Sequence, residues 1–135
     1  MKALRITLST ALLLAATVAF AQTQEGDVVV DVPFSFVAAG KTLPAGHYIV
    51  SHVNDSLRIH DRENRGMFVP THSVQRPLHE NASKLVFHRY GETYFLSEVW
   101  VSGSNLGRTL FTTKAERELA ERGAEQELAE VRAGK

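Results

Sequence analysis

Residues 85–101 read LVFHRYGETYFLSEVWV and form the clearest β-hairpin pattern in the chain. Two runs rich in β-branched and aromatic residues, Leu85–Tyr90 and Tyr94–Val101, flank a short polar segment. Gly91-Glu92 suits a two-residue loop, because glycine readily takes the positive φ that such a turn needs at its first central position. The stretch therefore predicts two antiparallel strands joined by a tight turn.

The loop length fixes the register of this hairpin, and two lengths fit the sequence. A two-residue loop gives the pairs Arg89–Tyr94, His88–Phe95, Phe87–Leu96 and Leu85–Glu98. A three-residue loop sets His88 against Leu96 instead. A slip of one residue changes every pairing, so any site built across the hairpin depends on this loop.

Both faces of the predicted hairpin carry large apolar side chains. One face holds Leu85, Phe87, Leu96 and Trp100, and the other holds Val86, Tyr90, Phe95, Val99 and Val101. A sheet with one face in water alternates more cleanly between apolar and polar residues. We therefore expect the second face to be covered by another sheet, by the closure of a barrel or by a helix.

Further strands are expected on both sides of the hairpin. Val28–Val37 alternates with period two, and Pro33, which lacks an amide hydrogen, favours an edge strand or a bulge there. Short runs with even spacing are typical of an antiparallel meander. These runs are His47–Val53, Leu57–His60 and Met67–Val74, with a further short strand at Arg108–Phe111. The count is six to seven strands.

The C-terminal segment is predicted to be helical. Thr113 and Glu116 have the spacing of a capping box, in which both side chains satisfy free amides at a helix start. Apolar positions continue to about Val131, although Gly123 weakens the middle of the helix. The fold class is therefore mainly β: a small antiparallel β-sandwich or barrel of six to seven strands with a C-terminal α-helix.

The first residues have the pattern of an export signal. Lys2 and Arg5 precede the apolar stretch 6–20, and alanines at 19 and 21 suit a signal peptidase. A membrane span needs about 18 continuous apolar residues, and this stretch is shorter and interrupted. We expect cleavage after Ala21. The organisation is then a signal peptide over 1–21, a flexible lead-in over 22–27, a β domain over 28–111, and a C-terminal helix with a frayed tail over 112–135.

Composition restricts the chemistry of the protein. The 135 residues include 15 basic and 15 acidic ones, and signal cleavage removes Lys2 and Arg5, so the mature chain is mildly acidic. Such a chain has no overall field that attracts nucleic acid or an anionic membrane. The absence of Cys excludes disulfides, thiolate metal sites and cysteine nucleophiles. We expect no nucleic-acid partner, no membrane insertion after signal cleavage and no cofactor.

Four segments carry a resemblance: VPFSF at 32–36, GKTLPAGHY at 40–48, KLVFHRYG at 84–91 and AEREL at 115–119. With them the chain resembles a group of small secreted bacterial proteins of acidobacterial type, rich in β structure and without an assigned activity. The Phe-His-Arg-Tyr-Gly stretch is the most specific part. The resemblance implies a β fold and export to the periplasm or the cell exterior. It assigns no catalytic residue.

The expected function is that of an exported, non-catalytic β domain with a binding or structural role in the bacterial envelope or outside the cell. Its partner is a protein or a small apolar ligand. In a lipocalin-like alternative, the ligand occupies an apolar cavity between the sheet and its cover. The residues expected to line that cavity are Phe34, Phe36, Phe87, Phe95 and Trp100.

Metal binding is a second alternative, because the chain has six His: His47, His52, His60, His72, His79 and His88. His52 and His60 flank one predicted turn and could approach each other, and imidazole is a good ligand for zinc or copper. No ligand motif is present, so no metal ligand is assigned.

An enzyme would need a polar cleft that gathers His88, Arg89 or Glu98. The nucleophile-elbow pattern fails at Gly103–Gly107, where Asn105 takes the place of the serine. No catalytic residue is therefore assigned.

Overall fold

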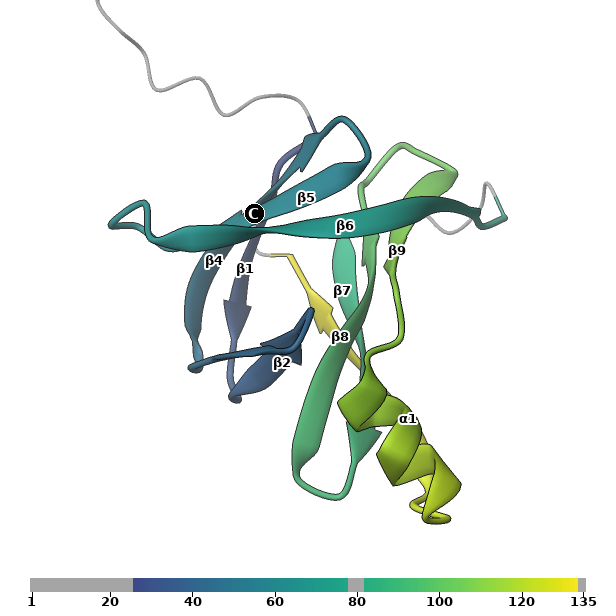
Figure 1. The fold of residues 1–135 in the computed structure, drawn as a ribbon. Coiled ribbons are helices and arrows are strands. Elements are labelled where there is room, and N and C mark those ends of the chain that lie inside the picture. The colour runs from purple at the N-terminus through teal and green to yellow at the C-terminus, as the bar shows by residue number, and fades with distance from the viewer. Residues whose placement is uncertain (1–25, 78–81, 134–135) are drawn as a thin grey trace, which may run out of the picture.

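The computed structural model describes residues 26–77 and 82–133. Within these ranges the chain forms ten strands and one helix (Figure 1). They are β1 (Val28–Val32), β2 (Phe36–Ala38), β3 (Lys41–Leu43), β4 (Gly46–Val53), β5 (Ser56–His60), β6 (Gly66–Gln75), β7 (Lys84–Tyr90), β8 (Thr93–Trp100), β9 (Leu106–Leu110), α1 (Lys114–Glu121) and β10 (Gln126–Arg132). The expected signal peptide, 1–21, and most of the lead-in lie outside the described residues.

The mainly β fold with a helix near the C-terminus is confirmed, but the prediction of six to seven strands is wrong for the described residues. The expected strand Val28–Val37 is divided in two, because Pro33 cannot donate a ladder hydrogen bond. Lys41–Leu43, expected to be a connection, pairs with β2 as β3. The positive φ of Ala39 and Gly40, +49° and +83°, makes that reversal. The third additional strand is β10.

The strands form one open, mixed sheet in the order β1-β4-β5-β6-β9-β8-β2-β3, and β7 pairs with both β8 and β10. β6 belongs to both halves of the sheet, because Gly66–Pro70 pairs with β5 and Thr71–Gln75 pairs with β9. Figure 1 shows β6 running across both groups of strands. Val37 pairs in parallel with Phe95, so the sheet is mixed rather than wholly antiparallel as predicted.

The β7–β8 hairpin has the register of the two-residue loop near its turn. Arg89 pairs with Tyr94, and the next two predicted pairs follow. Gly91 has φ +62°, as the predicted turn requires. The predicted pair of Leu85 with Glu98 is wrong, because Leu85 pairs with Val99.

A β-bulge at Ser97 causes this shift in register. Phe87 pairs with Leu96 and Val86 pairs with Glu98, which leaves Ser97 as the extra residue of β8. Beyond the bulge, the side chains of β8 change faces relative to the prediction. Val99 therefore joins the core cluster, and Trp100 does not.

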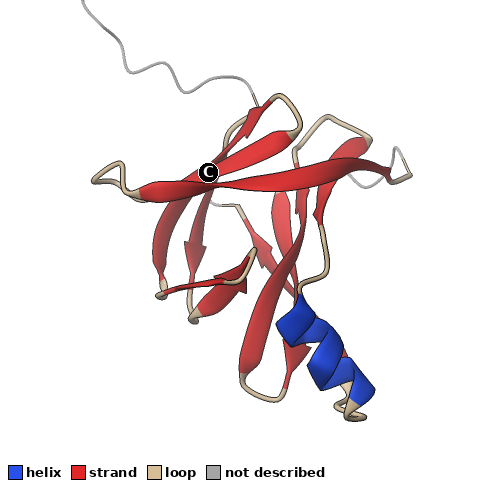
Figure 2. Ribbon diagram, in the orientation of Figure 1, coloured by secondary structure: helices blue, strands red, loops and turns tan. Residues whose placement is uncertain are grey.

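The helix ends much earlier than predicted (Figure 2). It was expected to reach about Val131, but α1 ends at Glu121 and the chain continues as β10. Gly123 has φ +79° and donates its amide hydrogen to the Ala120 carbonyl, so it ends the helix rather than weakening its middle. No helix among the described residues has the length and apolar character that crossing a membrane requires.

The core lies between the two halves of the sheet. Its largest fully buried members come from β1, β2, β4, β5, β6 and β7: Val28, Val30, Val32, Phe36, Val50, Leu57, Ile59, Val69, Leu85 and Phe87. The opposite face of the β7–β8 hairpin is buried too, at Val86, Tyr90, Phe95 and Trp100. The expectation that this face is covered is therefore confirmed, and α1 lies beside the turn end of the hairpin (Figure 1).

Candidate functional site

A pocket with a volume of about 400 Å³ opens between strands of the two halves of the sheet. This volume lies within the range of small-molecule sites, roughly 300–1,000 Å³. Its wall is mostly apolar and comes from Val50, Leu57, Val99, Val101 and Leu106. The remaining lining residues are small or polar: Gly26, Asp27, His52, Ser73, Ser104, Gly107 and Arg108. The pocket therefore has an apolar body and a polar rim.

Gly107 in β9 contributes backbone rather than a side chain to this pocket. It pairs with Trp100 of β8, and a Cβ added at Gly107 would lie 2.5 Å from Cε3 of the indole ring. Because the ring covers the position that a side chain would take, only glycine fits there. The apolar part of the wall consists of valine and leucine side chains, which are smaller than the aromatic rings that fill the neighbouring core.

Arg108 is the fixed polar group of the pocket. It pairs with Val99 and so projects to the pocket side of the sheet. Its Nε donates to Thr71 Oγ1 at 2.8 Å, its Nη1 to Ser73 Oγ at 2.7 Å, and its Nη2 to the Thr71 carbonyl at 3.2 Å. These bonds engage three of the five N–H groups of a guanidinium. The Asp55 carboxylate lies 3.8 Å from Nη2 as an ion-pair partner. The N–H groups that make no hydrogen bond here are the ones that an acceptor on a bound molecule would use.

The five aromatic residues predicted to line a cavity occupy other places. Phe34, Phe36 and Phe87 come together, with ring centroids of Phe87 at 5.0 Å from Phe34 and 5.4 Å from Phe36. Phe95 packs edge-on against Tyr90, and Trp100 lies under the Arg76 guanidinium. None of the five lines the described pocket. Their role in ligand binding stays a prediction.

A polar cluster lies on the other face of the β7–β8 hairpin and joins four elements. His88 Nδ1 lies 2.6 Å from Glu116 Oε1, and His88 Nε2 lies 3.1 Å from Ser97 Oγ. Tyr90 donates its hydroxyl hydrogen to the same Glu116 oxygen at 3.2 Å, and Gln126 Nε2 donates to the Tyr90 oxygen at 3.1 Å. Sequence reasoning missed this cluster, because β10 brings Gln126 beside Tyr90 only through tertiary pairing.

Burial of Tyr90 raises the pKa of its phenol, and the neighbouring carboxylate of Glu116 raises it further. Tyr90 therefore keeps its proton and donates a hydrogen bond to Glu116 at neutral pH. The capping box predicted for α1 is accordingly only half present. Thr113 Oγ1 accepts from the Glu116 amide at 3.4 Å, while the Glu116 carboxylate points to the hairpin.

The three residues named for an enzyme, His88, Arg89 and Glu98, are not gathered in one cleft. Arg89 donates to the Gly91 carbonyl at 2.7 Å, and Glu98 accepts from the Trp100 indole at 2.9 Å. His88 instead contacts Ser97 and Glu116. The partners of His88 are therefore Ser97 and Glu116, neither of which the sequence analysis had named as a site residue.

The histidines considered for a metal site are dispersed. His52 pairs with Leu57 and His60 pairs with Ile49, which places the two imidazoles on opposite faces of the sheet. Across residues 26–77 and 82–133, no group of three or more His, Cys, Asp or Glu side chains could hold a metal ion. His79 lies outside the described residues.

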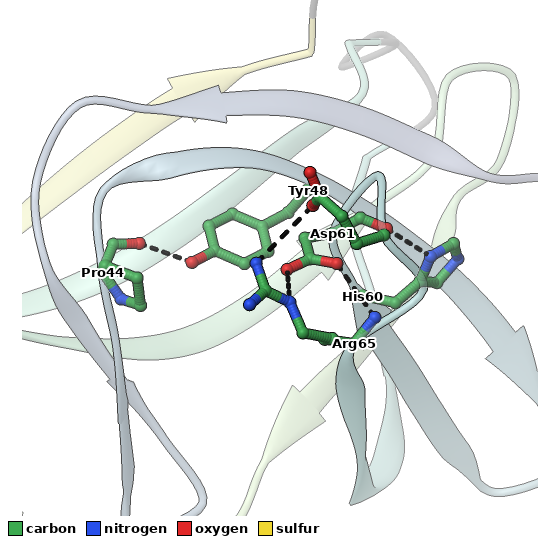
Figure 3. Close-up of polar contacts among 6 residues, drawn as sticks. Pro44, Tyr48, His60, Asp61 and Arg65 are labelled. Carbon is green, nitrogen blue, oxygen red and sulfur yellow. Dashed lines mark hydrogen bonds and ion pairs between the residues drawn. The ribbon is translucent and has the colours of Figure 1, made fainter.

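A third set of polar contacts stabilises the turn between β5 and β6 (Figure 3). Asp61 accepts from the amide of Arg65 at 2.9 Å and from its Nε at 3.0 Å, while the hydroxyl of Tyr48 donates to the Pro44 carbonyl. Burial, and then the charge of Asp61, raise the pKa of the Tyr48 phenol. These contacts fix the loops at this end of β4 and β5.

No protein-family model, curated protein or solved structure matches this chain. Function must therefore be argued from the pocket and the polar cluster themselves.

Proposed function

We propose that this protein is an exported β domain that binds a small, mostly apolar molecule in the pocket between β4–β5 and β8–β9. The observation that supports the proposal is the pocket itself, with its volume of about 400 Å³ and its wall of valine and leucine side chains. Apolar pockets of this size with a few fixed polar groups are the usual form of small-molecule sites.

The position of Arg108 in the pocket indicates which polar group the ligand carries. Its guanidinium is held by Thr71 and Ser73, with the exposed Asp55 carboxylate 3.8 Å from Nη2, so its direction is fixed and its remaining N–H groups can meet a ligand. Asp27 and His52 share the rim, so the charge there is mixed. We expect a ligand with an apolar body and one hydrogen-bond acceptor, such as a carboxylate.

Export is proposed from the sequence, in which the signal pattern ends at Ala21. Expression of the full chain in a bacterium, followed by N-terminal sequencing of the protein recovered from the periplasm or the medium, tests it. The expected first residue is Gln22. Recovery of the intact chain from the cytoplasm alone would contradict the proposal.

Binding is tested by titrating the purified exported protein with N-phenyl-1-naphthylamine, a neutral probe that fluoresces in apolar surroundings. Saturable binding with a dissociation constant of about 10 μM or below is expected. Val101→Phe places a phenyl ring at the pocket wall and should weaken binding about tenfold or more, which corresponds to about 1.4 kcal/mol.

The matched control is Val53→Phe, because Val53 is exposed at the end of β4 and does not line the pocket. This variant should bind the probe as the wild type does. Equal weakening in both variants, or the absence of saturable binding in the wild type, would overturn the proposal.

The polar end is tested by competition between two molecules of similar shape. 2-Naphthoate, which carries a carboxylate, should displace the probe at a lower concentration than naphthalene, because only the carboxylate accepts from Arg108. Equal or weaker displacement by 2-naphthoate would show that Arg108 contributes only structure.

A further inference from the structure

Three side chains of the polar cluster are hydrogen-bonded in series. Ser97 Oγ lies 3.1 Å from Nε2 of His88, and Nδ1 of the same ring lies 2.6 Å from Glu116 Oε1. A nucleophile within hydrogen-bond reach of a base, with the base oriented by a third group, is the arrangement that activates a serine hydroxyl. The three residues come from three separate elements, β8, β7 and α1.

Each of the three side chains is held in place by its own structural feature. Ser97 is the extra residue of the β8 bulge, and bulges re-aim side chains and are frequent beside active sites. Glu116 lies in the first turn of α1, is only 7% exposed, and is held from a second direction by the Tyr90 hydroxyl. Gln126 of β10 in turn donates to Tyr90. The hydrogen bonds of Tyr90 and Gln126 therefore support the Ser97–His88–Glu116 series.

One arrangement of the protons along this series suits base catalysis. An ionised carboxylate can only accept, so His88 donates its Nδ1 hydrogen to Glu116. In the neutral ring, Nε2 is then free of hydrogen and accepts from the Ser97 hydroxyl. This is the tautomer that a general base for Ser97 requires.

We infer that Ser97 and His88 form a catalytic pair, positioned by Glu116, that hydrolyses small carboxylic esters. In the first step Ser97 Oγ bonds to the ester carbonyl carbon while its proton passes to His88 Nε2. The bond to the leaving alcohol then breaks, and the alcohol takes that proton. Water attacks the acyl-serine, gives a proton to His88, and releases the carboxylic acid as Ser97 regains its hydrogen.

The exposure of the pair limits the substrate to small acyl groups. Ser97 is 8% exposed, whereas the side chain of His88 is 26% exposed. Hydrolysis therefore requires an ester small enough to reach the Ser97 hydroxyl from the side of the imidazole. This activity goes beyond the proposed binding function. The pocket lies on the core side of the hairpin with Val99, whereas His88 lies on the face opposite the core residue Phe87.

The test uses p-nitrophenyl acetate and the purified full chain. Hydrolysis above the rate in buffer is expected, together with transfer of one acetyl group to the peptide that contains Ser97, detected by mass spectrometry. Ser97→Ala should lower the rate about a hundredfold or more, a usual contribution of a general base and its nucleophile. Ser102→Ala, in an exposed loop, is the matched control and should keep the wild-type rate.

Glu116→Gln tests the positioning role, since glutamine no longer fixes the tautomer of His88. It should lower kcat with little change in KM.

Acetylation at Ser97 with loss of hydrolysis in Ser97→Ala supports the inference. Should Ser97→Ala fail to fold, labelling of the wild type decides alone. Absence of acetyl on Ser97, acetylation only at other side chains, or wild-type hydrolysis by a folded Ser97→Ala would overturn it.

Discussion

At the scale of single residues, the contact between Gly107 and Trp100 lies behind the pocket, on the face of the β8–β9 pair opposite Val99 and Arg108. The indole ring lies against the Cα of its cross-strand partner, so an alanine at 107 would place Cβ 2.5 to 2.8 Å from three ring carbons. Contacts this short force the ring or a strand to move. A residue without a side chain is therefore part of the structure of the candidate site.

Gly107→Ala should lower the free energy of unfolding by about 1–3 kcal/mol, the usual cost of overpacking a well-filled region. Urea denaturation followed by Trp100 fluorescence measures it. Gly46→Ala is the matched control in another strand, because its Cβ would meet only Tyr48 Cε2, at 3.8 Å. A change within about 0.5 kcal/mol is expected there. Equal urea midpoints for the wild type and Gly107→Ala would contradict the close approach of the Trp100 ring to Gly107.

Asp61 supplies a second prediction for a single residue (Figure 3). Burial alone would raise the pKa of its carboxyl, but hydrogen bonds from Arg65 and Glu63 and the charge of Arg65 outweigh this effect and lower the pKa. A carboxyl whose pKa is lower in the folded than in the unfolded chain stabilises the fold above the unfolded pKa of about 4. That contribution disappears as the pH falls through the folded-state pKa.

Asp61→Asn keeps an acceptor for the Arg65 amide but removes the charge. The wild type should therefore be the more stable of the two at neutral pH, and the difference should shrink below about pH 4. Urea denaturation of both proteins across this pH range checks the prediction. A difference that grows on acidification would contradict the assigned pKa direction.

The aromatic residues predicted to bind a ligand do not line the described pocket, and the reason is physical. Phe34, Phe36 and Phe87 were expected to line a cavity because they are large and apolar, yet large rings fill space, and Phe34 and Phe36 both pack against Phe87. The pocket instead lies where valines, leucines and a glycine meet. Which small residues face each other depends on strand pairing, and periodicity within one segment does not show it.

At the scale of elements, the residues after Gly123 show where periodicity is ambiguous. Ala124, Leu128 and Val131 have helical spacing, and together with the capping box before them they predicted a helix to about Val131, although a strand can also place Val131 on a buried face and Leu128 on an exposed one. In the structure β10 pairs with β7 from Gln126–Tyr90 to Arg132–Lys84. Pairing with the edge of β7 that β8 leaves open therefore stabilises residues 126–132 as a strand rather than a helix.

Two aspartate substitutions distinguish the strand from the helix. In a helix Leu128 and Val131 share a face, but in β10 Leu128 is 69% exposed and Val131 packs against the core. Val131→Asp should lower the free energy of unfolding by about 1–3 kcal/mol, while Leu128→Asp should change it by about 0.5 kcal/mol or less. Thermal denaturation of both variants checks this. Similar losses in the two would contradict β10.

The β7–β8 hairpin shows what a sequence predicts well. Its strands and its turn follow from local composition and turn chemistry, and of the two registers that the sequence left open the structure has that of the two-residue loop near Gly91. The bulge at Ser97 was not predictable, because no glycine or unusual residue marks it. The division of the first strand was only partly anticipated, at Pro33.

At the scale of the whole molecule, the β7–β8 hairpin separates two regions of different chemistry. Its core side contributes Val99 to the apolar pocket, and its other side carries the Ser97–His88–Glu116 series. Long-range pairings make both regions: β6 links the two halves of the sheet, and the pairing of β7 with β10 brings Gln126 to Tyr90. The mainly β class was predictable from the sequence, but these pairings depend on tertiary packing.

Mapping the bound probe on the ¹⁵N-labelled exported protein by NMR locates the ligand on the molecule. Titration with N-phenyl-1-naphthylamine should shift the amide signals of Val50, Leu57, Val99, Leu106 and Gly107 in a saturable manner, because these residues line the pocket. Shifts confined to the amide signals of the exposed Phe68 and Phe111, or to those of Phe34 and Phe36 in the aromatic cluster, would contradict binding in the pocket.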